Sequence, residues 1–228
     1  MAEKTTMIPP WFEGETPAGS YRSLFKWGGL REFKHPNRGL YKLIKDTFDL
    51  TDADFTQPRN LGLEPFQADA PIRLEACHLE RLQRIVGAEN LRTDAYTRTR
   101  VSYGCGMIDL LRLRNKIVEN IPDVVVAPGS TAEVAEIVRY CDEQRIPLYV
   151  YGAGSTVTRG TEAVCGGITL DMSKRMNQVI EFNETNQTIT VQPGMTGPQL
   201  EDILNHAPET LRASRGYTCR PSSQLLKR

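Results

Sequence analysis

The sequence lacks the features that mark membrane, secreted and nucleic-acid-binding proteins. Its longest strongly apolar runs, such as Asp123-Val-Val-Val-Ala127, are far too short to span a membrane. The amino terminus, Met1-Ala-Glu-Lys-Thr-Thr6, does not have the basic-then-apolar layout of a secretory signal. The 28 Lys and Arg residues equal the 28 Asp and Glu residues, so net charge gives no attraction to nucleic acid. We therefore expect a cytoplasmic protein with no membrane span and no nucleic-acid partner.

Histidine is scarce, and the cysteines show no pairing pattern. The three histidines lie far apart in the sequence, and such isolated histidines are usually surface or helix-packing residues. No two of the five cysteines have the spacing of a zinc finger or a thioredoxin-like motif. We expect reduced thiols in a reducing compartment and no metal site. These residues are His35, His78 and His206, and Cys77, Cys105, Cys141, Cys165 and Cys219.

The 228 residues suit one domain, or one domain with a sizeable appendage. Residues 1–68 are rich in Pro, Gly and aromatic residues, with one helix expected from Gly39 to Phe48. This segment cannot build a core alone and is expected to wrap around the rest. A helix is predicted over residues 69–86, with Asp69 as its cap, Pro71 in its first turn and Gly87 at its end. Residues 98–104 are predicted to be extended, and residues 108–118 to form a short amphipathic element.

A βαβ unit is predicted after Pro122, with parallel strands and a right-handed crossover. Val124–Val126 is its first strand and Ile146–Val150 its second. Between them Ser130 stands three residues before Glu133, which is the spacing of a capping box at a helix start.

An antiparallel half is expected to follow this unit. Gly167–Leu170 is predicted to be a strand, and Val179–Phe182 pairs with Thr188–Val191 in a predicted hairpin. A helix is predicted from about Pro198 to Leu204. The pattern as a whole predicts an α+β protein.

A glycine-rich loop after the second strand has the makings of a phosphate-binding site. It reads Tyr151-Gly-Ala-Gly-Ser-Thr-Val-Thr-Arg-Gly160, where small residues let backbone N–H groups approach an anion and hydroxyls add donors. A Walker loop is excluded, because no lysine lies between Tyr151 and Gly167. The Rossmann fingerprint is excluded as well, because Val157 stands where a third Gly or Ala should open a helix. Taken alone, the loop is read equally well as a tight turn between strands.

Four stretches carry a family resemblance when they are taken together in order. They are residues 121–134, 151–160, 167–177 and 191–194. They resemble the FAD-binding domain of the vanillyl-alcohol oxidase / p-cresol methylhydroxylase (PCMH) flavoproteins, and within it the alkylglycerone-phosphate synthase branch and bacterial FAD-binding oxidases. Lys26-Trp-Gly28 and Ser102-Tyr-Gly104 resemble earlier landmarks of that branch. The resemblance predicts an amino-terminal extension over residues 1–97 and a PCMH-type FAD-binding domain over residues 98–228.

The resemblance implies two α+β subdomains with FAD held between them. One segment matches the part of the family whose backbone amides meet the FAD diphosphate: Val150, Tyr151, Gly152, Ala153, Gly154, Ser155 and Thr156. Two more match segments beside the cofactor: Asp171, Met172 and Met176, and then Pro193, Gly194 and Met195. Ordinary turns with apolar packing would leave the same pattern in those two segments.

Two details refine the expected cofactor site. Ala153 replaces a usual glycine of the family, and its methyl group is tolerable only if its φ is negative. No histidine lies in the loop, so a covalent flavin link there is excluded and FAD is expected to bind non-covalently.

The resemblance stops after Gly216-Tyr-Thr-Cys219. The family continues with a Gly-His pair and a Ser- and Gly-rich segment that binds the rest of FAD, whereas this chain reads Arg220-Pro-Ser-Ser-Gln-Leu-Leu-Lys-Arg228. The second subdomain is therefore expected to be incomplete, and the family's acid–base residues cannot be assigned. Our hypothesis is a truncated or frame-shifted reading of a longer protein. Tyr103 and Tyr217 are interpreted as structural.

Three functions remain open from the sequence. The first is the FAD-binding portion of a flavin-dependent oxidoreductase, or of the alkyl-transferring branch, acting on a small-molecule substrate. The second is a non-catalytic remnant with weak or no FAD binding, whose unpaired strand edges would favour homo-oligomers. The third is a nucleotide-binding module of unrelated fold.

Overall fold

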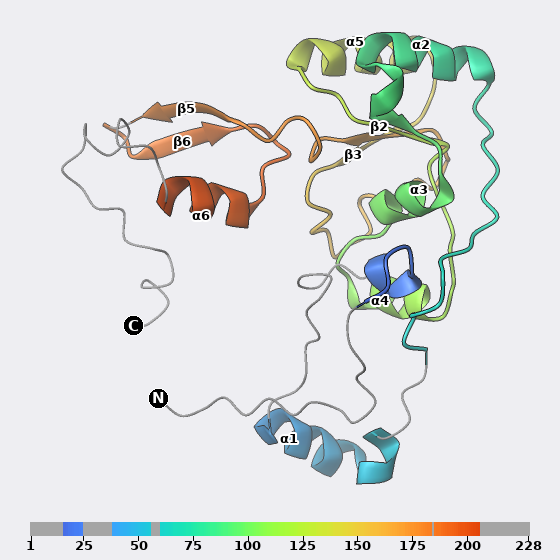
Figure 1. Ribbon diagram of the computed structural model, residues 1–228, viewed down its shortest axis with the longest axis vertical. Helices are drawn as coiled ribbons and strands as arrows, with labels where there is room; N and C mark the ends of the chain where they lie inside the picture. Colours follow the sequence, from blue (N-terminus) through green and yellow to red (C-terminus); the bar gives the residue numbers. More distant parts are fainter. Residues whose placement is uncertain (1–15, 25–37, 56–59, 184, 206–228) are drawn as a thin grey trace.

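The computed structural model describes residues 16–24, 38–55, 60–183 and 185–205 (Figure 1). The α-helices are α1 (Arg38–Phe48), α2 (Ala76–Val86), α3 (Ala95–Ser102), α4 (Met107–Arg114), α5 (Thr131–Gln144) and α6 (Gly197–Asn205). The strands are β1 (Leu91–Arg92), β2 (Val124–Val126), β3 (Leu148–Tyr151), β4 (Ile168–Asp171), β5 (Val179–Asn183) and β6 (Thr188–Val191). Three short 3-10 helices complete the set: η1 (Tyr21–Leu24), η2 (Asp52–Phe55) and η3 (Ala88–Asn90). This mixture confirms the predicted α+β class.

The main sheet has four strands in the order β1-β2-β4-β3. Strands β2, β4 and β3 are mutually parallel, and β1 pairs antiparallel with β2. The predicted βαβ unit is confirmed as parallel. The expectation that the strand at residues 167–170 belongs to an antiparallel half is wrong, because β4 lies between β2 and β3 and is parallel to both. Because the three strands are parallel, their carboxyl ends meet at one edge of the sheet, where ligands bind in open α/β sheets.

The two faces of the sheet are covered differently (Figure 1). Val124 and Val126 face α2 and α5, whose Leu82 and Ile137 are fully buried against them in the largest apolar cluster. Successive side chains of a strand point to opposite faces, so Val125 packs on the other side, where α3 lies. That second face is more polar, because it also buries Thr169 and Asp171 of β4.

The start of α5 follows the predicted capping pattern with one change. The Ser130 hydroxyl accepts a hydrogen bond from the Glu133 backbone N–H at 3.1 Å, which confirms Ser130 as the cap. The Glu133 carboxylate reaches one residue further back than in a capping box and accepts from the Gly129 N–H at 2.8 Å. The turn between β2 and α5 is thereby fixed at the carboxyl edge of the sheet.

The prediction of an extended segment over residues 98–104 is wrong. These residues belong largely to α3, which begins after Asp94, whose carboxylate accepts from the Thr97 N–H at 2.9 Å. Most of the polar side chains in this segment are buried, and two of them return hydrogen bonds to the helix backbone. Thr99 donates to the Ala95 carbonyl and Ser102 to the Arg98 carbonyl, each at 2.8 Å.

The predicted start of the helix over residues 69–86 is also wrong, because α2 begins only at Ala76. Residues 70–73 are held outside a helix by two buried side chains from distant parts of the chain. Arg98 donates to the carbonyls of Ala70 at 2.6 Å and Pro71 at 3.4 Å, and Asp123 accepts from the Arg73 N–H at 2.8 Å. The predicted end at Gly87 is confirmed by its positive φ of 88°.

The remaining predicted elements are present in the described residues. The helix at residues 39–48 is α1, the amphipathic element is α4, and the last predicted helix is α6. The predicted hairpin is β5–β6, with a register irregularity between Val179 and Glu181. Figure 1 shows this hairpin and α6 extending to one side of the main sheet; we call them the hairpin arm. None of the described helices is both long and apolar enough to cross a membrane.

The residues before position 98 contribute to the same body as those after it. Strand β1 joins the main sheet, and Leu24 of η1 packs with Tyr103 and Leu113 around α4. The division between residues 97 and 98 stays a prediction. The pairing of β1 with β2 crosses this boundary, and so does the packing of Leu24 on Tyr103 and Leu113. Lys26-Trp-Gly28 and residues 206–228, including Cys219 and Tyr217, lie outside the described residues.

Candidate functional site

The three segments that sequence analysis selected lie together at the carboxyl edge of the main sheet, where the hairpin arm leaves it. The Met172 N–H donates to the Tyr151 carbonyl at 2.9 Å, which joins the loop after β3 to the segment after β4. The Gly194 N–H donates to the Met176 carbonyl at 2.8 Å, which adds the turn after β6. Three segments that are separate in the sequence thus lie side by side.

Glycines are required where these segments touch. A Cβ at Gly194 would lie 2.0 Å from the Met172 carbonyl oxygen, and a Cβ at Gly152 would lie 3.3 Å from the Pro193 carbonyl oxygen. Gly154 has a φ of +66°, and a Cβ there would lie 2.6 Å from the ring and hydroxyl oxygen of Tyr151. The backbones can therefore approach closely only because side chains are missing.

The loop itself offers donors rather than acceptors. Among the described residues, none accepts a hydrogen bond from the backbone N–H groups of residues 152–155. Ala153 and Ser155 are exposed while Gly154 is buried, so the loop turns part of its backbone outward. Ala153 is absent from the residues with positive φ, so its methyl group meets the condition set by the sequence. Successive free amides in a turn favour an anion.

A fourth segment supports the loop, although sequence analysis noted it only as a landmark. The Cys105 N–H donates to the Thr156 carbonyl at 2.7 Å, and the Cys105 thiol lies 3.2 Å from the Gly154 carbonyl oxygen. A Cβ at Gly104 would lie 2.2 Å from the Thr156 carbonyl oxygen. The signal in the sequence was the Gly104-Cys-Gly106 pair of glycines, which marks a close backbone approach but not its partner.

Asp171 anchors the carboxyl end of β4, and it is almost completely buried. One carboxylate oxygen accepts from the Ser173 N–H at 3.1 Å and from the Ser173 hydroxyl. The other accepts from the Arg100 guanidinium at 2.5 Å, and that guanidinium lies 5.5 Å from the centre of the Tyr151 ring. Arg100 comes from α3, and sequence analysis missed it because it lies 71 residues away from Asp171.

The predicted site residues divide into exposed and buried groups. Val150, Ala153, Ser155 and Pro193 are exposed, whereas Tyr151, Gly154, Asp171 and Gly194 are buried. Gly152, Thr156 and Met195 are half-buried. Met172 and Met176 are buried within the largest apolar cluster, so their side chains pack in the core and only their carbonyls face the Gly194 turn.

Burial controls the titration of the aromatic and thiol groups near the sheet. It raises the pKa of the Tyr151 hydroxyl, against an opposing effect of the Arg100 charge. It also raises the pKa of the Cys141 thiol to about 11, which leaves that core thiol protonated and unreactive at neutral pH. Tyr103 likewise has a raised pKa through burial, and its hydroxyl donates to the Ile117 carbonyl at 2.8 Å, in keeping with a structural role.

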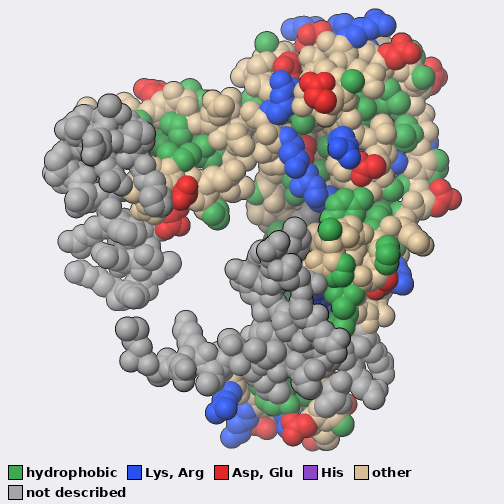
Figure 2. Space-filling model, viewed as in Figure 1, with side chains coloured by type: hydrophobic (Ala, Val, Ile, Leu, Met, Phe, Trp, Pro, Cys, Tyr) green, Lys and Arg blue, Asp and Glu red, His purple; other side chains and the backbone are tan. Residues whose placement is uncertain are grey.

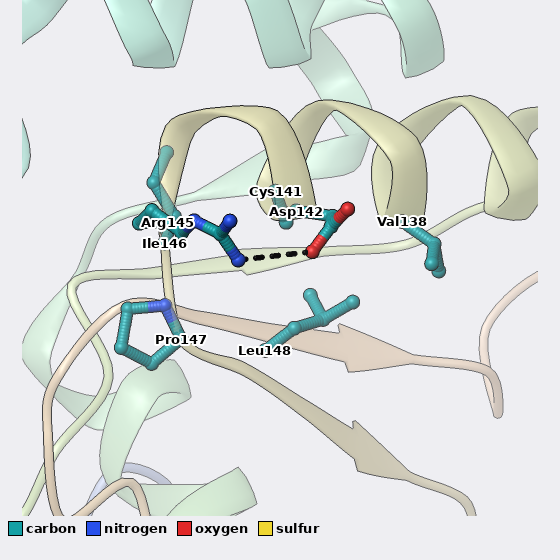
Figure 3. A pocket seen from close by; sticks show the side chains of 7 residues that line it. All are labelled: Val138, Cys141, Asp142, Arg145, Ile146, Pro147 and Leu148. Carbon is teal, nitrogen blue, oxygen red and sulfur yellow. Dashed lines mark ion pairs between the residues drawn. The ribbon is translucent and has the colours of Figure 1, made fainter.

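Two other features lie away from the loop. A surface pocket lies between the end of α5 and the start of β3, lined by Val138, Cys141, Asp142, Arg145, Ile146, Pro147 and Leu148 (Figure 3). It is at the opposite edge of the sheet from the loop. At α2, one potential metal-ligand atom from each of Glu75, Cys77 and His78 lies within 4.8 Å of the others, a grouping that the sequence analysis did not select. His78 there shares a 2.6 Å hydrogen bond with the Tyr140 hydroxyl, so it packs between helices as expected of a lone histidine.

Comparisons with known proteins point in one direction. The sequence model of a family described as an FAD binding domain matches residues 122–219. The alkyldihydroxyacetonephosphate synthase of Dictyostelium discoideum is 31% identical over 204 residues, which cover 78% of this chain and 33% of that protein. The glycolate oxidase subunit GlcD of Bacillus subtilis (strain 168) is 42% identical over 77 residues, which cover 34% of this chain and 16% of that protein.

A solved structure is similar in the same way. An alkyldihydroxyacetonephosphate synthase crystallised in P212121 superimposes with a TM-score of 0.58 at 27% identity, covering 67% of this chain and 29% of that chain. The matches cover about a third or less of the length of these relatives.

Proposed function

We propose that the chain is an FAD-binding domain of the vanillyl-alcohol oxidase / p-cresol methylhydroxylase type and that residues 150–156 hold the diphosphate of FAD. The convergence of the loop with the segments after β4 and β6 carries the proposal. Asp171, Met172 and Met176 would shape the floor of the site, and Pro193, Gly194 and Met195 would form its far wall. The bond to FAD would be non-covalent at this loop, since it contains no histidine.

The fit to a diphosphate rests on donors and on space. The amides of residues 152–155 are available as donors, and the hydroxyls of Ser155 and Thr156 stand beside them. Gly152 and Gly154 carry no side chains of their own, and the Tyr151 ring fills the space beside Gly154. Figure 2 shows Lys and Arg side chains on the main body next to the point where the hairpin arm leaves, which favours a negatively charged ligand.

Bound FAD would supply electron and hydride chemistry, while this chain would bind and orient it. We propose that the chain is the FAD-binding portion of an FAD-dependent oxidoreductase or of an alkylglycerone-phosphate synthase-like enzyme in the cytoplasm, acting on a small-molecule substrate. The alternative is a non-catalytic remnant with weak FAD binding. Self-association through the edges of strand β3 or of the hairpin stays a further proposal.

A visible absorption spectrum of the purified chain, before and after FAD addition and desalting, tests the proposal first. We expect flavin bands that stay with the protein after desalting. A colourless protein would instead support the remnant, and a preference for ATP or NAD over FAD in a competition assay would support an unrelated nucleotide-binding module.

A charge variant locates the diphosphate on the loop. Ser155→Glu places a carboxylate on an exposed loop residue, so we expect FAD affinity to fall at least tenfold, or about 1.4 kcal/mol. Gln144→Glu adds the same charge to an exposed residue at the opposite edge of the sheet and should leave the dissociation constant unchanged. Calorimetric titration with FAD measures both dissociation constants. Equal affinities of the two variants would contradict the proposal that the diphosphate binds at this loop.

A further inference from the structure

We infer that Arg100 is a positioning residue for the diphosphate ligand, which acts by neutralising Asp171 beneath the loop. The inference rests on the proposed function and extends it to a residue outside the three predicted segments. Arg100 contacts the carboxylate of Asp171 and the ring of Tyr151.

Asp171 carries a charge that is almost completely buried. Its side chain is 2% exposed, and it stands at the end of β4, directly beside Tyr151 in the register of the sheet. A buried carboxylate needs a partner, because the protein interior solvates it poorly. The neutral Ser173 supplies hydrogen bonds, whereas Arg100 supplies a positive charge at 2.5 Å.

Asp171 lies next to the start of the loop, because it is paired with Tyr151 across the sheet. Tyr151 begins the loop, and Met172, the residue after Asp171, is hydrogen-bonded to the Tyr151 carbonyl. An anion on the loop would therefore lie near the Asp171 carboxylate. Like charges repel strongly where water is scarce, so an unpaired Asp171 would oppose diphosphate binding. Arg100 removes that opposition.

Arg100 also lies beside the aromatic ring that packs under the loop. The Arg100 guanidinium lies 5.5 Å from the centre of the Tyr151 ring, and that ring occupies the space where a side chain at Gly154 would lie. Arg100 could thus serve through its charge or through packing under the loop. The two roles predict opposite results when Asp171 loses its charge.

The test measures FAD and ADP dissociation constants by calorimetry for the full chain and three variants. Arg100→Met should weaken binding of both ligands at least tenfold, because Asp171 stays charged and unpaired. Arg100→Met/Asp171→Asn should return affinity to within about threefold of the wild type, since charge and countercharge are removed together. Asp171→Asn alone should bind both ligands at least as tightly as the wild type, because Arg100 keeps its charge.

The Asp171→Asn result keeps the inference testable even if Arg100→Met fails to fold. A tenfold loss of affinity in Asp171→Asn, or a double variant as weak as Arg100→Met, would overturn the charge role. Equal affinity of Arg100→Met and the wild type would overturn the inference while leaving FAD binding intact. A wild-type chain that binds neither FAD nor ADP would overturn the proposed function, and the inference with it.

A matched control exists on the other face of the sheet. Arg81 pairs with Glu136 at 2.8 Å and lies 6.0 Å from the centre of the Tyr140 ring, which repeats the arginine, carboxylate and tyrosine arrangement away from the loop. Arg81→Met should therefore leave both dissociation constants unchanged. A loss of affinity there equal to that of Arg100→Met would show a general effect of arginine removal and would overturn the inference.

Discussion

Gly194 shows how one residue without a side chain can hold a site together. It is buried, and its N–H donates to the Met176 carbonyl while its Cα faces the carbonyls of both Met172 and Met176. Its φ is not positive, so the requirement is for space rather than for an unusual backbone conformation. Gly197, three residues later, has no atom within 4 Å of a built Cβ and serves as a comparison.

Gly194→Ala is expected to destabilise the protein by about 1–3 kcal/mol, because the new methyl would lie 2.0 Å from a backbone oxygen and the turn must move. FAD affinity should fall as well, since the turn forms part of the proposed site. Gly197→Ala should change the free energy of unfolding by less than about 0.5 kcal/mol. Denaturant unfolding of both variants measures this, and similar stabilities would contradict the account of the turn.

Helix α3 is stabilised by hydrogen bonds rather than by an apolar face of its own. Its side chains are mostly polar, and the helix forms because Asp94 caps it and because its hydroxyls bond back to its own carbonyls. It then carries Arg98 to the carbonyls of Ala70 and Pro122 and Arg100 to Asp171. One short helix thus connects the preceding segment, the sheet and the proposed site.

Asp94→Ala should lower the free energy of unfolding by about 0.5–2 kcal/mol at neutral pH, because the cap hydrogen bond to Thr97 is lost. Asp94→Asn keeps an oxygen acceptor and should lose less. Thermal unfolding of the two variants beside the wild type measures the difference. Equal losses in both would mean that charge, and not the cap, stabilises the start of α3.

The same residue predicts a pH dependence. Burial raises the pKa of Asp94, but hydrogen bonds from Thr97 and the charge and hydrogen bond of Arg92 outweigh it, so the pKa is lowered in the folded protein. A lowered pKa means that the contribution of the carboxylate is fully present above the unfolded value of roughly 4 and is lost as pH falls through the folded value. The stability advantage of the wild type over Asp94→Asn should therefore shrink below about pH 4.

The two faces of the main sheet are packed by different kinds of residue. One face carries the apolar cluster with α2 and α5, and the other carries the buried polar residues that hold α3 and the loop. The hydroxyl of Thr169 is the one buried side-chain atom without a hydrogen-bond partner among the described residues. We therefore expect stability to depend mainly on the first face, and the geometry of the proposed site on the second.

Two neighbouring residues of α5 test this division. Ile137 is fully buried in the apolar cluster, while Val138 is 45% exposed. Ile137→Ala should cost about 2–5 kcal/mol, because a cavity remains between α5 and the sheet. Val138→Ala should cost less than about 0.5 kcal/mol. Denaturant unfolding followed by circular dichroism compares the two variants. A small loss of unfolding free energy in Ile137→Ala would mean that the apolar cluster around Ile137 contributes little to stability.

The sequence by itself determined the features that depend on neighbouring residues. Strands β2 and β4, the cap at Ser130, the hairpin and the glycine-rich loop were all predictable, because periodicity, caps and turn residues act over a few positions. The resemblance to FAD-binding flavoproteins could be found in the sequence for the same reason, since it rests on local motifs that follow one another in order.

The tertiary structure alone decided what depends on distant residues. The place of β4 between β2 and β3, the extended course of residues 70–73 and the helical state of α3 all follow from contacts across the chain. The pairing of Arg100 with Asp171 and the packing of Gly104 on Thr156 belong to the same class. No local pattern encodes them, because burial and hydrogen bonding of these groups exist only once the sheet has formed.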